Sequence, residues 1–167
     1  MNLGPDDVLT GTSPMFHVAG TILMGISTFL AGSEIVLMSP SGMRNPAMVT
    51  NFWQICERYG VTLAFGVPTA IGAITDVPLS GSDISSVRGG LTGAASLPVA
   101  VREKFEAVTG TRLNEIYGMT EASGIISCNP FEGEGGSGSA GLRFASATGT
   151  VRRVTEYGAV CVPALAV

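Results

Sequence analysis

The sequence predicts an α/β fold in which a largely parallel sheet is flanked by helices. Short apolar, β-branched runs alternate along the chain with longer segments whose apolar residues recur at helical spacing. The connections between them are short and carry glycine or proline, as expected for successive strand–helix units. The 167 residues match the size of one domain, and the 46% apolar content is sufficient for a buried core.

The first unit begins with a strand at Val8 to Thr10. The glycine-rich apolar segment from Val18 to Leu30 predicts a buried helix, and Glu34 to Met38 predicts a buried strand that ends at turn residues. Polar residues interrupt the helical segment too often for a membrane span, and no basic region precedes it. We therefore expect neither a transmembrane segment nor a secretion signal.

The second unit begins with a helix from Pro46 to Gly60, because proline suits a first helical turn and glycine a helix end. The residues expected on its buried face are Phe52, Ile55, Cys56 and Tyr59. A strand from Val61 to Phe65 and a short helix from Pro68 to Ile74 are expected next.

The third unit begins with a strand from Val87 to Thr92. Ser96 is expected to cap the next helix, which contains Pro98 near its start and ends at Gly110. Its spacing predicts inward-facing Val101, Phe105 and Val108, and solvent-facing Arg102, Glu103 and Glu106. A strand from Arg112 to Ile116 then closes at Tyr117-Gly118.

The composition changes after Asn129, and we divide the chain there. Residues 1–130 form the central α/β part, and residues 131–167 a glycine-rich loop with the start of a β subdomain. Residues 131–139 (FEGEGGSGS) predict a loop, and residues 141–154 alternate like an antiparallel β segment. A further apolar run begins at residues 160–162, close to the last residue, Val167.

Charge and residue counts exclude several classes of function. The net charge of −4 argues against a nucleic-acid partner, because phosphate contacts need clustered cations. Three cysteines without a CxxC pair and a single histidine, His17, cannot form a zinc site, and the odd cysteine count fits a reducing cytoplasm. The only lysine, Lys104, lies within an expected helix, so it is not a phosphate-loop lysine. The nucleophile-elbow motif GxSxG does not occur.

The segment from Tyr117 to Glu121 (YGMTE) directly follows a predicted strand, and ligands bind at the carboxyl edge of parallel sheets. Tyr117 offers a ring that can stack on a base, and Gly118 permits close approach of a ligand. Thr120 supplies a hydroxyl for a phosphate oxygen, and Glu121 supplies an oxygen ligand for Mg²⁺. The alternative is a strand-to-helix turn in which Tyr117 packs and Thr120 caps a helix.

Several segments, in this order, resemble motifs of the adenylate-forming (AMP-binding) superfamily of acyl-CoA synthetases, luciferases and peptide-synthetase adenylation domains. Residues 14–20 (PMFHVAG) resemble its FHxxG motif, residues 89–98 (GGLTGAASLP) its Gly-Ala-rich strand, and residues 114–121 (NEIYGMTE) its YGxTE motif. Residues 138–142 (GSAGL) resemble its GSxG segment. By this resemblance the chain is identified as an internal part of an acyl-CoA synthetase-like ligase, within the large N-terminal domain of such an enzyme.

The resemblance implies that a carboxylic acid is activated with ATP and Mg²⁺ to an acyl-adenylate, and that the acyl group passes to CoA. Tyr117 would stack on adenine, Thr120 would touch the α-phosphate, and Glu121 would help to hold Mg²⁺. His17 would line the acyl or thiol-entry channel; the alternative is a partly buried histidine with satisfied hydrogen bonds. The other implied nucleotide- or acyl-adenylate-binding residues are Gly93, Ala94, Ala95, Glu115, Ile116 and Gly118.

Two positions depart from the family pattern. Ser96 stands where the family often has proline, and Ile116, where it often has glycine, would narrow or reshape the acyl side of the pocket. Fatty acids and aryl acids both remain open as substrates.

The family's phosphate loop would precede His17, and its ribose-binding aspartate, hinge and catalytic lysine would follow Val167. We therefore expect a fragment whose partners are the missing flanking domains of the same enzyme, and which does not turn over alone. The alternative is a non-catalytic nucleotide-binding or partner-binding module left from such an enzyme.

Overall fold

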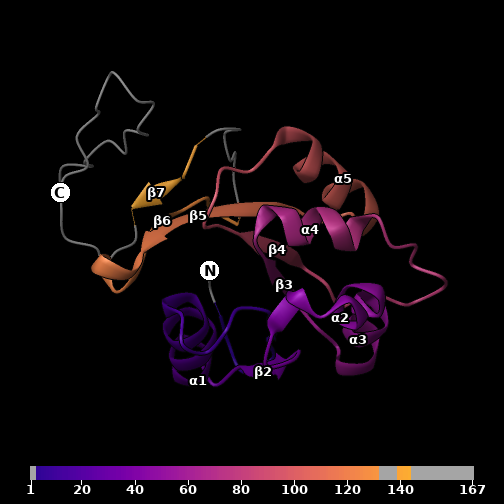
Figure 1. Cartoon of the computed structure of the whole chain (residues 1–167), viewed down its shortest axis with the longest axis horizontal. Helices are drawn as coiled ribbons and strands as arrows, with labels where there is room; N and C mark the ends of the chain where they lie inside the picture. The colour runs from indigo at the N-terminus through magenta and orange to yellow at the C-terminus, as the bar shows by residue number, and fades with distance from the viewer. Residues whose placement is uncertain (1–2, 132–138, 144–167) are drawn as a thin grey trace.

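The computed structural model describes residues 3–131 and 139–143. Within them, seven strands form one sheet in the order β2-β1-β3-β4-β5-β6-β7 (Figure 1). The strands are β1 (Val8–Gly11), β2 (Glu34–Leu37), β3 (Leu63–Gly66), β4 (Gly89–Thr92), β5 (Leu113–Met119), β6 (Gly124–Cys128) and β7 (Leu142–Arg143). All pairs from β2 to β5 are parallel, whereas β5–β6 and β6–β7 are antiparallel. The predicted α/β class with a largely parallel sheet is confirmed.

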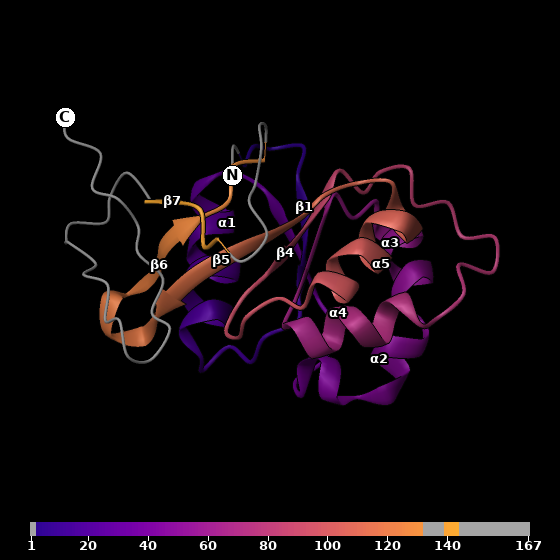
Figure 2. The same ribbon diagram turned by 90° about the horizontal axis from the view of Figure 1, so that it is seen from above.

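Helices cover both faces of the sheet, as the views from the side and from above show (Figure 2). One face carries the π-helix η1 (Ala19–Ile26) and its continuation α1 (Ser27–Leu30). The other carries α2 (Pro46–Thr50), α3 (Phe52–Tyr59), α4 (Pro68–Thr75) and α5 (Val99–Thr109). Two short 3₁₀ turns complete the described elements, η2 (Gly42–Arg44) and η3 (Thr120–Ala122).

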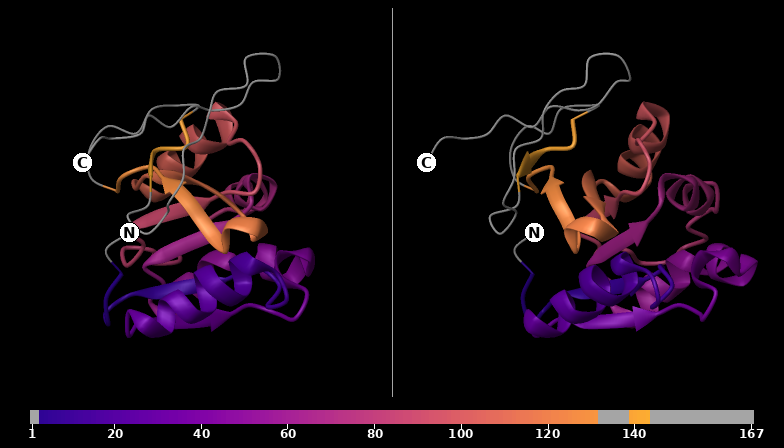
Figure 3. Two further views of the ribbon diagram at one scale, coloured as in Figure 1. Left: turned by 90° about the vertical axis from the view of Figure 1, so that its left-hand side faces the viewer. Right: turned by 60° about the vertical axis from the view of Figure 1, so that its left-hand side comes forward.

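The core consists of two apolar clusters, because successive strand residues point to opposite faces of the sheet. On the side of α2–α5, Phe105 packs with Phe52, Trp53, Ile71 and other buried residues. On the side of η1, the smaller cluster consists of Leu23, Met24, Phe65, Leu91, Ile116 and Cys128. In Figure 3 the β5–β6 hairpin, in orange, stands beside the indigo η1 segment, with which β6 makes contact.

Two predictions of burial in the first unit are wrong. Among the described strands, β2 pairs only with β1 and so lies at an edge of the sheet, and its residue Leu37 is 60% exposed. The helix predicted over residues 18–30 is present, but Phe29 and Leu30 at its end are exposed. An apolar run fixes the type of element, but its position in the sheet depends on pairing with distant strands.

The helix predicted from Pro46 to Gly60 is divided at Asn51 into α2 and α3, and Gly60 ends it in a left-handed conformation (φ 60°). Phe52 and Cys56 are fully buried as predicted, but Tyr59 is half exposed. Trp53, which was not expected on the buried face, is buried. Its burial leaves no polar atom unpaired, because its indole N–H donates hydrogen bonds to the carbonyl oxygens of Ile74 (3.0 Å) and Val77 (3.2 Å).

The helix α5 corrects two expectations. It begins at Val99 after Pro98, and no side chain in the described part of the chain caps it, so the predicted cap by Ser96 is wrong. Phe105 is fully buried as predicted, whereas Arg102 and Glu106 are only partly exposed. The Glu106 side chain does not extend fully into solvent, because its carboxylate accepts a hydrogen bond from the backbone N–H of Leu113 (3.2 Å).

The strand β5 does not close at Tyr117-Gly118 but continues to Met119, because it pairs with the unpredicted strand β6. The strand-to-helix turn considered for Tyr117 is therefore wrong. Of the predicted antiparallel segment at 141–154, residues 142–143 form β7 against β6, and residues 144–154 lie outside the described residues. The loop prediction for residues 132–138 and the apolar run at 160–162 also lie outside them, and the division at residue 130 stays a prediction. Across the described ranges, every helix is too short or too polar to cross a membrane.

Candidate functional site

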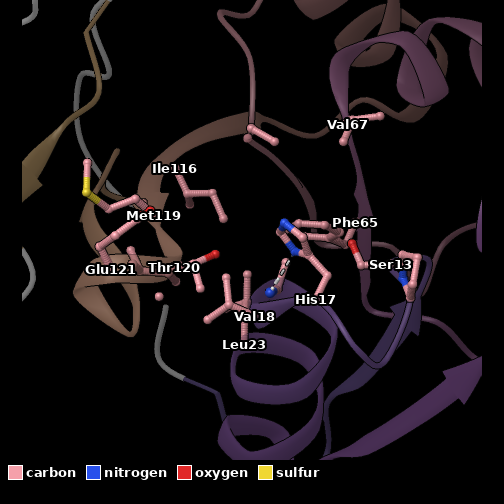
Figure 4. Close-up of a pocket in the computed structure, with 17 residues that line it drawn as sticks. Ser13, His17, Val18, Leu23, Phe65, Val67, Ile116, Met119, Thr120 and Glu121 are labelled. Carbon is pink, nitrogen blue, oxygen red and sulfur yellow. Dashed lines mark hydrogen bonds between the residues drawn. The ribbon is translucent and has the colours of Figure 1, made fainter.

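A cavity of about 470 Å³ lies between η1 and the β5–β6 hairpin (Figure 4). Part of its wall consists of residues that follow four parallel strands: Ser13 after β1, Val67 after β3, Gly93 and Ala94 after β4, and Thr120 after β5. All these strands end at the same edge of the sheet. The chain passes from β2 on one side of β1 to β3 on its other side, so the cavity lies next to a topological switch point, where α/β folds bind ligands.

Seven of the predicted site residues line this cavity: His17, Gly93, Ala94, Ile116, Gly118, Thr120 and Glu121. They come from segments up to about a hundred residues apart in the sequence, and the fold brings them together. Three predicted residues do not line the cavity, namely Ala95, Glu115 and Tyr117. For two of these the reason is strand alternation: Glu115 and Tyr117 flank Ile116 in β5, and because the Ile116 side chain lines the cavity, theirs point to the other side of the strand.

Tyr117 lies on the opposite face of β5, paired with Ser127 of β6, and is 40% exposed. Its ring therefore borders solvent across the sheet from His17 and Leu23.

The loop after β4 is held in an unusual conformation. Ala94 has φ 70°, in the left-handed region that costs a residue with a Cβ about 1–2 kcal/mol. The carboxylate of Glu115 holds the far end of this loop, because it accepts a hydrogen bond from the backbone N–H of Leu97 (3.2 Å), which lies between β4 and α5. Ala94 and Ala95 are exposed, so their backbone is accessible to a ligand.

Two glycines at the site are required by close packing of the chain itself. A Cβ on Gly93 would lie 2.7 Å from Cγ1 and 2.8 Å from the carbonyl oxygen of Ile116. A Cβ on Gly118 would lie 2.2 Å from the carbonyl oxygen of Gly124 on the neighbouring strand. The close approach that the structure shows at Gly118 is that of β6, and the approach of a ligand at this residue stays a prediction.

His17 stands exposed at the rim of the cavity, before η1. Its Nδ1 accepts a hydrogen bond from the backbone N–H of Ala19 (3.1 Å), so the neutral ring carries its proton on Nε2. Among the described residues Nε2 has no hydrogen-bond partner, which leaves a donor available at the rim. The alternative of a partly buried histidine with satisfied hydrogen bonds is not what the structure shows.

Thr120 and Glu121 lie in η3 on the opposite rim, and both are exposed. Within the described ranges their side chains make no hydrogen bond, and no group of three or more His, Cys, Asp or Glu residues could hold a metal. Mg²⁺ often binds through one or two carboxylates together with phosphate oxygens and water. Glu121 fits such a role, in which a phosphate ligand supplies the other oxygen atoms.

The cavity is also lined by apolar residues that the sequence analysis missed, namely Leu23, Phe65, Val67 and Ile125. Phe65 and Val67 could have been found, because Phe65 ends a predicted parallel strand and Val67 follows it, at the same edge of the sheet as Gly93. Ile125 could not, because its strand β6 was not predicted.

The comparison with known proteins points to one family. A family model described as "AMP-binding enzyme" matches residues 1–159. The chain is 34% identical over 130 residues to a marinolic acid–CoA ligase of Pseudoalteromonas sp. (strain SANK 73390), covering 78% of this chain and 20% of that protein. It is 36% identical over 169 residues to a long-chain-fatty-acid–CoA ligase of Bacillus subtilis (strain 168), covering 95% of this chain and 29% of that protein.

The fold is also similar to that of solved structures. The anthranilate CoA ligase AuaEII, solved in complex with anthranoyl-AMP, has a TM-score of 0.74 at 23% identity, and the match covers 86% of this chain and 27% of that one. Apo MatB from Rhodopseudomonas palustris has a TM-score of 0.72 at 25% identity, with 86% and 27% covered. The chain thus spans less than a third of the length of each of these proteins.

Proposed function

The chain belongs to the AMP-binding enzyme family, and on this premise we propose that it forms part of the acyl-adenylate site of an ATP-dependent acid–thiol ligase. The observation that carries the proposal is the meeting of Thr120, Glu121, His17 and the Gly93-Ala94 loop around one cavity at the carboxyl edge of the sheet. The relatives named CoA ligases support the same class of reaction.

The proposed reaction has two steps. A carboxylate oxygen of the acid attacks the α-phosphorus of ATP, and the bond from this phosphorus to the bridging oxygen breaks, so that pyrophosphate leaves. The sulfur of the CoA thiol, after losing its proton, then attacks the acyl carbon, and the bond to the AMP oxygen breaks. The products are the acyl-thioester and AMP. We place this reaction in the cytoplasm.

The described residues suit the first step. Thr120 would donate its hydroxyl hydrogen to an α-phosphate oxygen, and the Gly93-Ala94 backbone would border the acyl-adenylate. Glu121 would hold Mg²⁺, which when bound offsets the negative charge that develops on the leaving pyrophosphate. Tyr117, Ala95 and Glu115 would serve the adenine on the other side of the Gly93-Ala94 loop.

A second candidate is a non-catalytic nucleotide-binding or partner-binding module. It is favoured by one observation: no lysine or arginine belongs to the described lining of the cavity. Cationic side chains held next to the phosphate groups contribute strongly to the rate of phosphoryl and adenylyl transfer. Turnover would accordingly depend on the flanking domains of the family, and the 167-residue chain would bind without reacting.

Binding of AMP and of Mg²⁺-ATP to the chain, measured by isothermal titration calorimetry, tests the proposal. Tyr117→Ala should weaken both by about tenfold, because stacking on a base contributes about 1–3 kcal/mol. Glu121→Gln should weaken only Mg²⁺-ATP. Tyr59→Ala is the matched control, since Tyr59 is an exposed tyrosine of α3 that does not line the cavity.

A pyrophosphate-release assay with fatty and aryl acids tests the second candidate. We expect nucleotide binding without pyrophosphate release from the chain alone. Robust release would overturn the second candidate. Nucleotide affinities that Tyr117→Ala and Glu121→Gln leave unchanged would contradict the proposed site.

A further inference from the structure

The loop between β4 and α5 is held at both ends by neighbouring residues of β5. At its start, the Gly93 backbone lies so close to Ile116 that an added Cβ would be 2.8 Å from the Ile116 carbonyl oxygen. At its other end, the Leu97 N–H donates a hydrogen bond to Oε1 of Glu115 (3.2 Å), and the Leu97 side chain is buried in the core on the side of α5. The residues between these two points, 94–96, are exposed.

The hydrogen bond from Leu97 to Glu115 is the polar contact that keeps this loop in place. Among the backbone N–H groups of residues 94–97, only that of Leu97 donates a hydrogen bond to another described residue. The loop conformation is also unfavourable in itself, because Ala94 has φ 70°, and such a backbone persists only where its surroundings determine it. Loss of the Glu115 carboxylate should therefore release the loop.

The middle of the loop offers hydrogen-bond donors to a ligand. The N–H groups of residues 94–96 are without a partner among the described residues, and Ala94 also lines the cavity. A free backbone N–H binds water or an acceptor atom of a ligand. A nucleotide has such acceptors in its ring nitrogens and phosphate oxygens. These donors can serve a bound nucleotide only while the loop is held in place.

The Glu115 side chain is directed to the loop and away from the cavity. It lies two residues after Leu113, which belongs to the core on the side of α5, so both side chains point to that face of the sheet. In the sheet, Glu115 is paired with Thr92, the last residue of β4 before the loop begins. Its carboxylate therefore reaches the loop from the neighbouring strand.

We propose that Glu115 is a positioning residue: its carboxylate holds the loop between β4 and α5 in place for a bound nucleotide, which Glu115 itself does not touch. This inference rests on the proposed function and specifies the role of Glu115 within it. What matters is then an oxygen atom at the correct distance from the Leu97 N–H, and the negative charge is of minor importance.

Three variants separate the length of the side chain from its charge. Glu115→Gln keeps an oxygen at the same distance without the charge, Glu115→Asp keeps the charge on a shorter side chain, and Glu115→Met has neither the oxygen nor the charge. Hydrogen exchange of the Leu97 amide is measured by NMR in the ligand-free chain, and AMP affinity by calorimetry. Glu115→Gln should stay within about threefold of the parent chain in both, whereas the other two should raise the exchange rate and weaken AMP, each by about tenfold.

Glu106→Met is the matched control. The Glu106 carboxylate also accepts a hydrogen bond from a backbone N–H, that of Leu113 (3.2 Å), but at the other end of β5. This variant should raise the exchange rate of the Leu113 amide and leave both the Leu97 exchange rate and the AMP affinity unchanged. The fluorescence of Trp53 verifies that each variant is folded, and if Glu115→Met does not fold, Glu115→Asp takes its place in the test.

The possible outcomes distinguish this inference from the proposed function. If AMP binds to the parent chain but Glu115→Met and Glu115→Asp leave the Leu97 exchange rate or the AMP affinity unchanged, the inference is wrong and the proposed function stands. The same holds if Glu115→Asp binds AMP as the parent chain does while Glu115→Gln binds it weakly, because the charge would then be what matters. If AMP does not bind to the parent chain, both are overturned.

Discussion

Gly118 connects the packing of the β5–β6 hairpin to the site, and its replacement by alanine tests that connection. The backbones of the two strands meet at this residue, where the pairing register also shifts. An added Cβ would lie 2.2 Å from the carbonyl oxygen of Gly124 and 2.9 Å from its carbonyl carbon. Since both are backbone atoms of the paired strand, no rotation of a side chain can relieve the overlap.

The magnitude follows from this geometry. Contacts of real Cβ atoms essentially never fall below 3.0 Å, so the Gly124 carbonyl would have to withdraw by about 0.8 Å. Overpacking typically costs about 1–3 kcal/mol, and we expect the upper end, about 3 kcal/mol, because a strand has to move. For a chain of this size that corresponds to a fall of Tm by about 6–12 °C.

The assay is urea unfolding followed by the fluorescence of Trp53, the only tryptophan of the chain and a buried one. Gly72→Ala is the matched control: it lies within α4, and the nearest atom to its added Cβ is Val101 Cγ2 at 3.8 Å. The same chemical change should stabilise there by up to about 1 kcal/mol, because alanine favours a helix over glycine.

The variant should also bind AMP more weakly, since the hairpin carries Thr120 and Glu121. If Gly118→Ala unfolds at the same urea concentration as the parent chain, the close approach of β5 and β6 at this residue is refuted, and with it the structural reason for the glycine.

Two further predictions concern residues that do not line the cavity. The Asp7 carboxylate accepts hydrogen bonds from Arg88 (Nε 2.7 Å, Nη2 2.9 Å); burial raises the pKa of Asp7, but these and other hydrogen bonds lower it by more, so that it lies below its ordinary value. Asp7→Asn should lower the free energy of unfolding in urea by about 2 kcal/mol at pH 7, and this loss relative to the parent chain should vanish as the pH falls through the lowered pKa of Asp7. Asp6→Asn is the control and should lower the free energy of unfolding hardly at all. Equal losses from the two variants would refute the stabilising role of the Asp7–Arg88 pair. Burial raises the pKa of the Cys56 thiol to about 12 and that of the Cys128 thiol to about 11. Iodoacetamide at pH 8 should therefore alkylate neither thiol in the folded chain, which peptide mass mapping would show. Rapid modification of either cysteine would contradict its burial.

The local elements were predictable because their signals are local. Pro46 and Gly60 mark helix ends through backbone geometry that each residue imposes by itself, and both lie at helix ends in the structure. The strand β6 was missed because its run, from Gly124 to Cys128, is short and becomes a strand only by pairing with β5. The exposure of β2 was missed for a similar reason, since an edge strand and a central strand can have the same composition.

The candidate site likewise has features that the sequence predicts and others that depend on the tertiary structure. The sequence by itself predicted that residues suited to a nucleotide lie at the carboxyl ends of strands, because the YGMTE motif and the Gly93-Ala94 loop are each a short contiguous segment. Only the tertiary structure decided which face each side chain serves: Ile116 enters the cavity with His17, whereas Tyr117 lies across the sheet. It also decided why residue 118 is glycine, since the overlapping carbonyl belongs to another strand. The physical reason is that conformation and chemistry are properties of a few neighbouring residues, whereas burial and contact depend on partners that folding brings from far along the chain.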